Sequence, residues 1–489
     1  MKMLLIGMDG AQEASFKRGW TPFIESLIGR GQSLDLKEDL ISRGWAEIMT
    51  GQHGLVTDML YERPTADGTL GWTEKSRLQD IPGLGTKVKP IWQILNEQGF
   101  KVGIMNVPTT YPAPEVDGFF VSGGGGGGPV NQDVTEAQCH PKSLKDKLAS
   151  SGYIVDERIS SLLGDKQLYN PADFFSRLEL MTEKRTDTFI QNSKDFEVNF
   201  GFVVYRSSVT AETFIQPQTE LFSQENKEIG GPFFEAVEQF YRHFDEQVKR
   251  LVESFPESEV VLVSDHSMVT RKWSVNTNEF LVEQGWQQKS SSRRGVYDFV
   301  KSFKHLIPHA IRQKLKSNPK VRSAYESMVT FDPKVSQAFS MAFSTGVHGI
   351  YINDSKRFGG PVEQDQIGAV SVKIIEAFNA HPTSVEYGLK AYKKSPSNEG
   401  CSDIFPDIYI QVPDGYLTSN EFSEFVSKHP LPDELVDFRE ITKTGNYCIK
   451  GRSPLAVNVK GEWLLKPNRN KQDLTLIYDQ IAAFFKAKI

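Results

Sequence analysis

The sequence predicts an α/β protein built on a large, mostly parallel sheet with helices on both faces and one inserted segment. Apolar runs of strand length alternate with longer amphipathic segments, which is the pattern of strands connected by crossover helices. The runs are apolar throughout, as expected for strands buried on both faces. A chain of 489 residues buries about three quarters of its unfolded surface and needs no disulfide or metal to fold.

The predicted strands are short apolar runs, and helical segments precede three of them. An amphipathic helix that contains Ile91 and Leu95 ends at Gly99, just before the second strand. Segments with helical periodicity at residues 172–194 and 232–254 precede the fourth and fifth strands, and a last helix covers about residues 473–486. The strands are expected at residues 3–8, 101–106, 117–122, 201–205 and 260–264.

One stretch of the chain differs from the rest in charge. Residues 288–325 contain a single acid, Asp298. Their basic residues are Lys289, Arg293, Arg294, Lys301, Lys304, Arg312, Lys314, Lys316, Lys320 and Arg322. We predict an inserted basic cap at residues 276–334 and an α/β core made of residues 1–275 and 335–489. Such a charge run is either a solvated helical face or a surface that attracts an anionic substrate.

Composition excludes several classes of protein. The 62 acids and 56 bases give a net charge of −6, so a globally basic nucleic-acid binder is excluded. The three cysteines are far apart, which argues against a disulfide framework or a cysteine metal site. No apolar run reaches the roughly 18 residues of a membrane span. The first residues are too short an apolar run for a signal peptide and include Asp9, so we expect a cytoplasmic protein.

Three side chains that can bind a metal follow predicted strands. Asp9 comes directly after the first strand, and Asp265 and His266 follow the run at residues 260–264. The carboxyl ends of parallel strands meet at one edge of a sheet. Two carboxylates and an imidazole at this edge can converge on one divalent cation, although an aspartate after a strand is often a turn or cap residue.

Ser42 is a candidate nucleophile at the start of a predicted short helix. The free N–H groups of a helix start favour an anion such as phosphate. A serine hydroxyl beside a metal can ionise and attack an ester. The alternative is that Ser42 only caps the helix.

Several stretches together resemble the type I phosphodiesterase/nucleotide pyrophosphatase family of the alkaline phosphatase superfamily. The resemblance runs in order from residue 3 to about residue 455 and implies a large α/β enzyme. It implies cleavage of phosphate or related esters by a Ser or Thr nucleophile at a two-metal centre. The stretches are Gly7-Met-Asp9-Gly10, Trp45 with Thr50-Gly51 and His53-Gly54, Ile91-Trp-Gln-Ile-Leu, Asn106-Val-Pro-Thr-Thr-Tyr111-Pro, Gly118-Phe-Phe-Val-Ser-Gly123, Ser264-Asp265-His266, Gln337-Ala-Phe339, Gly349-Ile-Tyr-Ile-Asn353 and Phe405-Pro-Asp407-Ile-Tyr.

The resemblance implies one metal site and departs from the family at the other. Asp9, Asp265 and His266 match the protein ligands of one site, with Ser42 as the nucleophile and a further ligand. The family hydroxyl belongs one residue earlier, at Ile41. The second site lacks its three ligands, because Arg206-Ser-Ser-Val-Thr-Ala-Glu-Thr213 and Thr444-Gly-Asn-Tyr447 contain none of them at the family positions. We therefore expect one divalent metal rather than two: zinc, with manganese or magnesium as alternatives.

Two arginines and one further histidine are secondary candidates. Arg206 stands where the missing second site begins, and Arg43 flanks Ser42. A guanidinium matches the geometry of phosphate or sulfate and stays charged, so Arg206 could replace the lost metal; the alternative is an ordinary ion-pair arginine. His348 precedes an apolar run and could be recruited as a metal ligand, although a lone histidine there is more often structural.

These observations favour a metal-dependent hydrolase of phosphodiesters or related phosphate or sulfate esters that acts through Ser42. Its partner would be a small anionic substrate, and no nucleic acid or membrane span is expected. Two alternatives stay open. One is a catalytically silent family member that binds an anionic ligand or a partner. The other is a transferase that moves a phospho or sulfo group to an alcohol through the same site.

Overall fold

The chain forms two units in a computed structural model. The model describes residues 1–61, 63–64, 70, 72–73, 77–124, 134–157, 170–221, 231–290, 331–341, 348–393, 405–419, 424–429, 448–468 and 471–487. The first unit is Met1–Tyr61, Lys75–Thr270 and Leu431–Ile489, and the second is Glu62–Glu74 and Arg271–Pro430. Each unit is described by itself.

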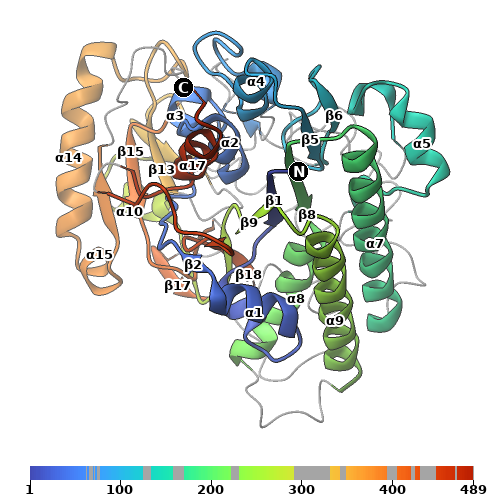
Figure 1. Ribbon diagram of the computed structural model, residues 1–489. Coiled ribbons are helices and arrows are strands. Elements are labelled where there is room, and N and C mark those ends of the chain that lie inside the picture. The colour runs from blue at the N-terminus through green and yellow to red at the C-terminus, as the bar shows by residue number, and fades with distance from the viewer. Residues whose placement is uncertain are drawn as a thin grey trace. The chain divides into compact units, whose positions relative to one another are not determined.

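An eight-stranded sheet organises the first unit (Figure 1). Its strand order is β2-β19-β9-β1-β8-β5-β6-β7, and the five strands from β9 to β6 are parallel. These five are β9 (Glu259–Val263), β1 (Met3–Met8), β8 (Phe200–Tyr205), β5 (Val102–Met105) and β6 (Gly118–Val121). The other three strands pair antiparallel with their neighbours: β2 (Gln32–Ser33) and β7 (Cys139–His140) at the edges, and β19 (Ala456–Asn458) between β2 and β9. The predicted mostly parallel α/β fold is confirmed.

Both faces of this sheet are covered by helices, because alternate residues of each strand point to opposite sides. In β1, Leu4, Ile6 and Met8 belong to one buried cluster, and Met3 and Leu5 belong to the other. Helices α1 (Pro22–Arg30), α7 (Pro171–Asp195) and α9 (Gly231–Glu253) supply the first cluster. The second cluster is supplied by α2 (Gly44–Thr50), α4 (Ile91–Asn96) and α17 (Thr475–Phe485).

The strand register brings the ends of three strands level with one another. Met8 at the end of β1 pairs with Tyr205 at the end of β8, and Gly7 pairs with Val263 at the end of β9. After β9 the chain continues into β10 (Ser267–Thr270), which pairs antiparallel with β18 (Cys448–Gly451). The side chains that follow β1, β8 and β9 therefore meet at one edge of the sheet.

The remaining elements of the first unit are short, apart from one helix. They are α3 (Gly54–Thr57), α5 (Leu144–Ser150), α8 (Ser207–Leu221) and the 3₁₀ turns Glu13–Phe16, Leu78–Asp80 and Glu136–Gln138. Helix α8 begins one residue after Arg206 and contacts β10 and β18.

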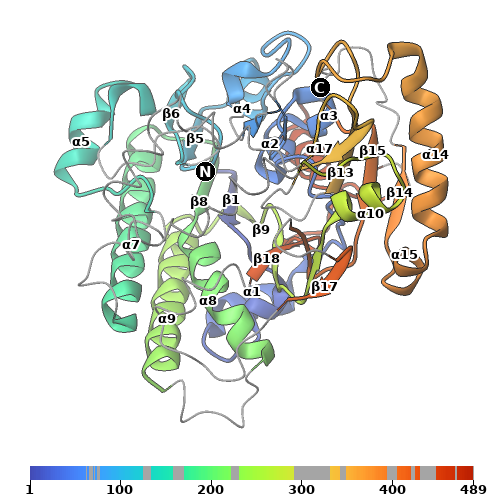
Figure 2. The ribbon, with the colours of Figure 1, turned by 180° about the vertical axis from the view of Figure 1, so that it is seen from behind.

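In the second unit, the described residues form small antiparallel and mixed sheets and three helices. A four-stranded sheet has the order β12-β13-β15-β14, and its core contains Phe280, Ile350 and Phe378. Figure 2 shows α14 beside β14 in this unit. Its elements are β3 (Arg63–Pro64), β4 (Trp72–Thr73), β11 (Trp273–Val275), β12 (Ala338–Ser340), β13 (His348–Ile352), β14 (Lys390–Tyr392), β15 (Ile408–Gln411), β16 (Tyr416–Thr418), β17 (Val426–Lys428), α10 (Thr277–Glu283), α14 (Ile367–Ala380), α15 (Pro382–Glu386) and the 3₁₀ turn Gln364–Gln366.

The division into units differs from the boundaries that the sequence suggested. Residues 276–290 belong to the second unit together with residues 335–430, and Phe280 and Leu281 of α10 lie in its core. Residues 291–330, which hold most of the basic stretch, lie outside the described residues, so the cap stays a prediction. None of the helices in the described ranges has the length and apolar character needed to cross a bilayer.

Candidate active site

Asp9, Asp265 and His266 gather at the carboxyl edge of the large sheet. One ligand atom of each lies within 4.8 Å of the others, and all three side chains are buried. His266 Nε2 is 3.7 Å from Asp9 Oδ1 and 3.4 Å from Asp265 Oδ2. Within the described residues this is the one group of acidic, histidine or cysteine side chains with such an arrangement. The predicted convergence of these three side chains is therefore seen in the structure.

The donor atoms of this group fit a divalent cation. His266 Nδ1 lies 2.8 Å from the Ser267 carbonyl oxygen, so Nδ1 carries the proton and the Nε2 lone pair faces the two carboxylates. The second oxygen of each carboxylate is already held: Gly10 N donates to Asp265 Oδ1 at 3.4 Å, and Trp45 Nε1 donates to Asp9 Oδ2 at 3.2 Å. Two ligands of a tetrahedral zinc with bonds near 2.1 Å are about 3.4 Å apart, close to the separations seen here.

Burial dominates the electrostatics of the group. It raises the pKa of Asp9 and of Asp265, and the Asp265 carboxylate raises that of Asp9 further. Arg206 and Lys450 oppose this shift by attracting both carboxylates. Burial and the nearby Lys450 lower the pKa of His266 to about 3. The imidazole is therefore neutral, which is the form that binds metals.

Two glycines let helix α2 approach the group. A Cβ atom on Gly44, the first residue of α2, would lie 2.3 Å from the Asp265 carbonyl oxygen. A Cβ atom on Gly7 in β1 would lie 2.8 Å from the Trp45 ring. Without these side chains, α2 packs against the strand ends, and its Trp45 indole reaches Asp9.

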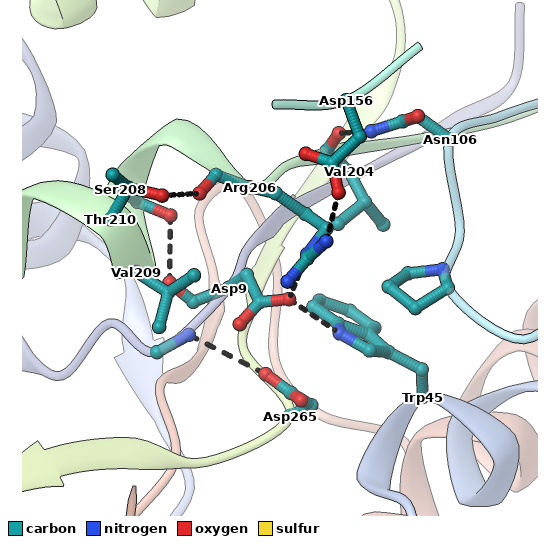
Figure 3. Close-up of polar contacts among 12 residues, drawn as sticks. Asp9, Trp45, Asn106, Asp156, Val204, Arg206, Ser208, Val209, Thr210 and Asp265 are labelled. Carbon is teal, nitrogen blue, oxygen red and sulfur yellow. Dashed lines mark hydrogen bonds and ion pairs between the residues drawn. The ribbon is translucent and has the colours of Figure 1, made fainter. Parts of the chain in front are cut away.

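Arg206 lies between Asp9 and a carboxylate that sequence reasoning missed (Figure 3). Its Nε is 3.5 Å from Asp9 Oδ2, and its Nη1 donates to Asp156 Oδ2. Asp156 is 2% exposed, so it holds the guanidinium firmly in place. The run Tyr153-Ile-Val before Asp156 is apolar and ends in an aspartate, as the first strand does at Asp9; that pattern could have revealed it. The structure thus places Arg206 beside the group formed by Asp9, Asp265 and His266, which we call the metal-type group.

Lys450 and Tyr61 are two further residues that the sequence did not indicate. Lys450 lies on β18 and pairs with Met268, two residues after His266. Its ammonium is 4.0 Å from the centre of the Tyr61 ring. Burial lowers the pKa of Lys450 to about 8, against the attraction of Asp265 and Asp9. A lone lysine between Ile449 and Gly451 gave no signal of this position.

The Ser42 hydroxyl is directed at a carboxylate other than those of the metal-type group. It donates to Glu47 Oε1 and is 1% exposed. His53 Nε2 lies 3.8 Å from the same Glu47 oxygen and 3.0 Å from Asp39 Oδ2. Within the described part of the chain, Ser42 makes no hydrogen bond to Asp9, Asp265 or His266. The N-cap of α2 is Arg43, and its side chain does not cap, so Ser42 is not the helix cap.

Arg43 contacts the backbone of the segment that leads to Tyr61. Its Nε donates to the Leu60 carbonyl at 3.0 Å, and its Nη2 donates to the Tyr61 carbonyl at 3.2 Å. The guanidinium carbon is 5.0 Å from the centre of the Tyr61 ring. Arg43 therefore fixes Tyr61, and a direct role toward a substrate stays a prediction.

Two sequence predictions fall outside what the structure describes. His348 begins β13 in the second unit, but its side chain lies outside the described residues, so its role as a ligand stays a prediction. Thr444–Tyr447, where the family has a second-site histidine, also lies outside them. In the other second-site segment, Thr210 Oγ1 donates to the Arg206 carbonyl at 3.3 Å, as an ordinary helix residue does.

Comparison with phosphonoacetate hydrolase agrees with the fold. Phosphonoacetate hydrolase from Sinorhizobium meliloti 1021, in complexes with phosphonoformate and phosphonoacetate, gives TM-scores of 0.53 and 0.55 at 11% identity over 99% of this chain and 95% of that chain. Murine ectonucleotide pyrophosphatase/phosphodiesterase 5 gives a TM-score of 0.47 at 10% identity over 100% of this chain and 96% of that chain. Comparison with curated proteins gives no match.

A family profile covers most of the sequence. The profile described as type I phosphodiesterase/nucleotide pyrophosphatase matches residues 3–429, a range that includes Asp9, Arg206, Asp265 and His266. The match agrees with the resemblance seen in the sequence and with the alkaline phosphatase-like fold. The chain therefore belongs to the type I phosphodiesterase/nucleotide pyrophosphatase family of the alkaline phosphatase superfamily.

Proposed function

We propose that this protein hydrolyses a phosphodiester or a related phosphate or sulfate ester at a single divalent metal held by Asp9, Asp265 and His266. One observation carries the proposal. Each carboxylate has one oxygen near His266 Nε2, while its other oxygen is held by Trp45 or by Gly10 N–H. Family membership supports the reaction class.

The donor set favours zinc, with manganese and magnesium as alternatives. An imidazole nitrogen with two carboxylate oxygens suits zinc, whereas carboxylates alone would favour the harder ions. When bound, such a metal polarises the ester and lowers the pKa of a coordinated oxygen. We propose one metal rather than two, because Arg206 and Ser207–Thr213 replace the second-site ligands of the family.

Arg206 takes over the electrostatic part of the missing metal. Its guanidinium is held by Asp156 and lies beside Asp9, so it is preorganised. A positioned guanidinium can donate two N–H hydrogen bonds to the oxygens of the phosphoryl or sulfuryl group that is transferred. This arrangement stabilises the charge that develops on those oxygens as the ester bond breaks.

Ser42 is the proposed nucleophile, and Glu47 is the proposed acceptor of its proton. Burial, together with the neighbouring Glu38, raises the pKa of Glu47 well above its usual range, so its carboxylate is a stronger base than usual. The Ser42 oxygen bonds to phosphorus or sulfur, the ester oxygen leaves, and the hydroxyl proton moves to Glu47. Water then attacks the same atom and releases Ser42.

The hydrogen bond from Ser42 to Glu47 also favours a competing function. If the hydroxyl stays in that bond, the site binds an anion without forming the covalent intermediate. The protein would then be a silent relative that binds an anionic ligand. A transferase is a variant of the first proposal, in which an alcohol replaces water in the second step.

Metal analysis combined with turnover tests the proposal. The purified protein should hold about one metal per chain and should cleave at least one p-nitrophenyl ester among a phosphate monoester, phosphodiester, phosphonate and sulfate. The phosphonate is included because the neighbouring hydrolase binds phosphonoacetate. Neither metal nor turnover across the four esters would reject hydrolysis and favour the silent alternative. Product analysis with added alcohols distinguishes transfer from hydrolysis.

A serine pair tests the nucleophile. Ser42→Ala should lower kcat by at least about 1,000-fold with the metal retained. Ser371→Ala is the matched control, because Ser371 is also a buried hydroxyl in a hydrogen bond, but in the second unit. Wild-type turnover by Ser42→Ala would assign the attack to water and remove Ser42 from the mechanism.

A further inference from the structure

Tyr61 has a buried hydroxyl without a partner near the metal-type group. The side chain is 7% exposed, and its Oη has no hydrogen-bond partner among the described residues. Buried hydroxyls are normally paired, since an unpaired one costs about 1–3 kcal/mol. After burial, the strongest effect on its pKa comes from Asp265, and Asp9 also contributes. The two carboxylates therefore act on this hydroxyl electrostatically, and no group of the described residues forms a hydrogen bond with it.

Lys450 lies against the same ring and is partly buried. Its ammonium is 4.0 Å from the ring centre, and its side chain is intermediate between buried and exposed. No Asp or Glu of the described residues lies within ion-pair distance of this ammonium. It is attracted by Asp265 and Asp9 and repelled by Arg206 and Arg43. The ammonium thus keeps hydrogen-bond donors for another acceptor.

The net charge around the metal-type group would favour a bound anion once a metal is present. Three aspartates and three basic residues form this surrounding, so the side-chain charges cancel when all are ionised. A divalent cation would leave an excess of two positive charges, which a bound oxyanion offsets. The six residues are Asp9, Asp156, Asp265, Arg43, Arg206 and Lys450.

We propose that Lys450 Nζ and Tyr61 Oη form a subsite that binds a non-bridging oxygen of the phosphoryl or sulfuryl group. Lys450 supplies a positive charge and Tyr61 a neutral O–H donor, while Arg206 binds beside Asp9. Together they hold the oxygens that a second metal would otherwise hold. The inference rests on the proposed function, because it places the substrate at the same centre.

The chemistry of the Tyr61 phenol and the Lys450 ammonium suits these two roles in binding an oxygen. Burial raises the pKa of Tyr61 well above its usual range, so the phenol keeps its proton and donates it in a hydrogen bond. A lysine ammonium is a compact charge with three donors and can follow an oxygen as it moves during transfer. Arg206, in contrast, is fixed by Asp156 and provides the rigid side of the subsite.

Phosphate binding to the metal-loaded full chain tests the subsite. Inorganic phosphate is titrated by calorimetry into wild type, Lys450→Met and Tyr61→Phe. Lys450→Met should weaken binding by about 10-fold or more, and Tyr61→Phe by about 3- to 10-fold, because hydrogen bonds to charged groups are the stronger ones. Metal content measured on the same samples should not change in either variant.

Lys2→Met is the matched control. Lys2 also has its ammonium over an aromatic ring, 4.8 Å from the centre of Phe100, but it precedes the opposite end of β1. It should bind phosphate as wild type does. Unchanged phosphate affinity in Lys450→Met and Tyr61→Phe would overturn the subsite. Tyr61→Phe keeps the ring, so it decides the matter if Lys450→Met does not fold.

The subsite and the proposed function can fail separately. Ester turnover by wild type together with unchanged phosphate affinity and turnover in both variants rejects the subsite and leaves hydrolysis intact. Absence of turnover in wild type, together with phosphate binding that is weakened by Lys450→Met, rejects hydrolysis and supports the subsite in a binding protein.

Discussion

Two buried acidic clusters each contact a side chain of helix α2, and their charges are neutralised in different ways. Trp45 reaches Asp9 of one cluster, and Glu47 belongs to the other. Residues two apart on a helix point in different directions, so α2 contributes one side chain to each cluster. In the first, Arg206 and Lys450 attract the carboxylates. In the second, His53 Nε2 lies 3.8 Å from Glu47 Oε1 and attracts its carboxylate.

In the second cluster, a proton on Glu38 takes the place of the cations that surround the first cluster. Burial, with help from Asp39, raises the pKa of Glu38 to about 8. Burial and the charge of an ionised Glu38 raise the pKa of Glu47. A proton on Glu38 removes the second effect and leaves Glu47 as the carboxylate that accepts the Ser42 hydrogen bond. A protonated carboxyl donates a hydrogen bond and binds a metal poorly. The comparison teaches that burying acids does not by itself make a metal site; the arrangement of cations and donors around them decides.

The largest expected effect comes from removing one of the proposed metal ligands of the first cluster. Asp265→Asn should lower metal affinity by more than about 100-fold, because even partners outside the ligands cost about 10- to 100-fold. Turnover should fall with metal occupancy. Elemental analysis after dialysis against a chelator, followed by ester assays, measures both.

Asp245→Asn provides the control for that experiment. Asp245 is a buried aspartate of the first unit that accepts hydrogen bonds from Phe23 N and Ile24 N at the start of α1. Its variant should lose stability and keep the metal. If both variants keep the metal equally well, the first cluster is not a metal site and the contrast between the clusters has no functional meaning.

A smaller effect is expected from changing Arg206, whose positive charge offsets the carboxylates of the first cluster. Arg206→Lys keeps the charge but cannot span Asp9 and Asp156 with a planar pair of donors. Its kcat/KM should fall by about 10-fold, and Arg206→Ala should lose about 100-fold, as for one preorganised donor. Steady-state kinetics with metal content held constant measures these losses.

Arg177→Lys is the matched variant for the arginine. Arg177 pairs with Glu157, the residue after Asp156, so it tests the loss of an arginine–carboxylate pair next to the site. Its turnover should match wild type. Turnover by Arg206→Ala at the wild-type rate would mean that Arg206 is an ion-pair residue without a role in the reaction.

The sequence was sufficient to predict the sheet and the first cluster. The apolar runs before Asp9 and Asp265 match β1 and β9, and parallel strands bring their carboxyl ends to one edge. That geometry follows from local pattern and a general rule of α/β folds. Convergence of Asp9, Asp265 and His266 therefore did not require knowledge of any long-range contact.

The partners of the first cluster and the whole second cluster could not be predicted in this way. Lys450 reaches the site through the pairing of β10 with β18, segments about 180 residues apart. Which way Ser42 points depends on the rotation of α2, which Gly44 and Trp45 set by packing. Such contacts depend on tertiary packing between distant segments, and local residue pattern does not encode them.

The smallest expected effect concerns stability and sharpens the difference between the clusters. Glu38 keeps its proton in the folded protein up to a pKa of about 8, whereas its usual pKa is 4.5. Between these pH values the unfolded chain binds fewer protons at this residue, so stability falls as pH rises. The loss of stability is at most about 1.4 kcal/mol per pH unit. It reaches its full size once the pH exceeds the folded pKa, because Glu38 is then ionised in both states.

Glu38→Gln should remove this dependence. The amide cannot ionise, and its oxygen can still accept the hydrogen bond that Leu474 N donates at 2.9 Å. Urea unfolding at pH 5, 6, 7 and 8 should show a smaller loss of stability with pH than in wild type, and Glu462→Gln, at an exposed glutamate, should follow wild type. Parallel pH profiles for Glu38→Gln and wild type would show that Glu38 is ionised when folded. The second cluster would then need a cation to neutralise Glu38, and the proposed difference between the two clusters would be wrong.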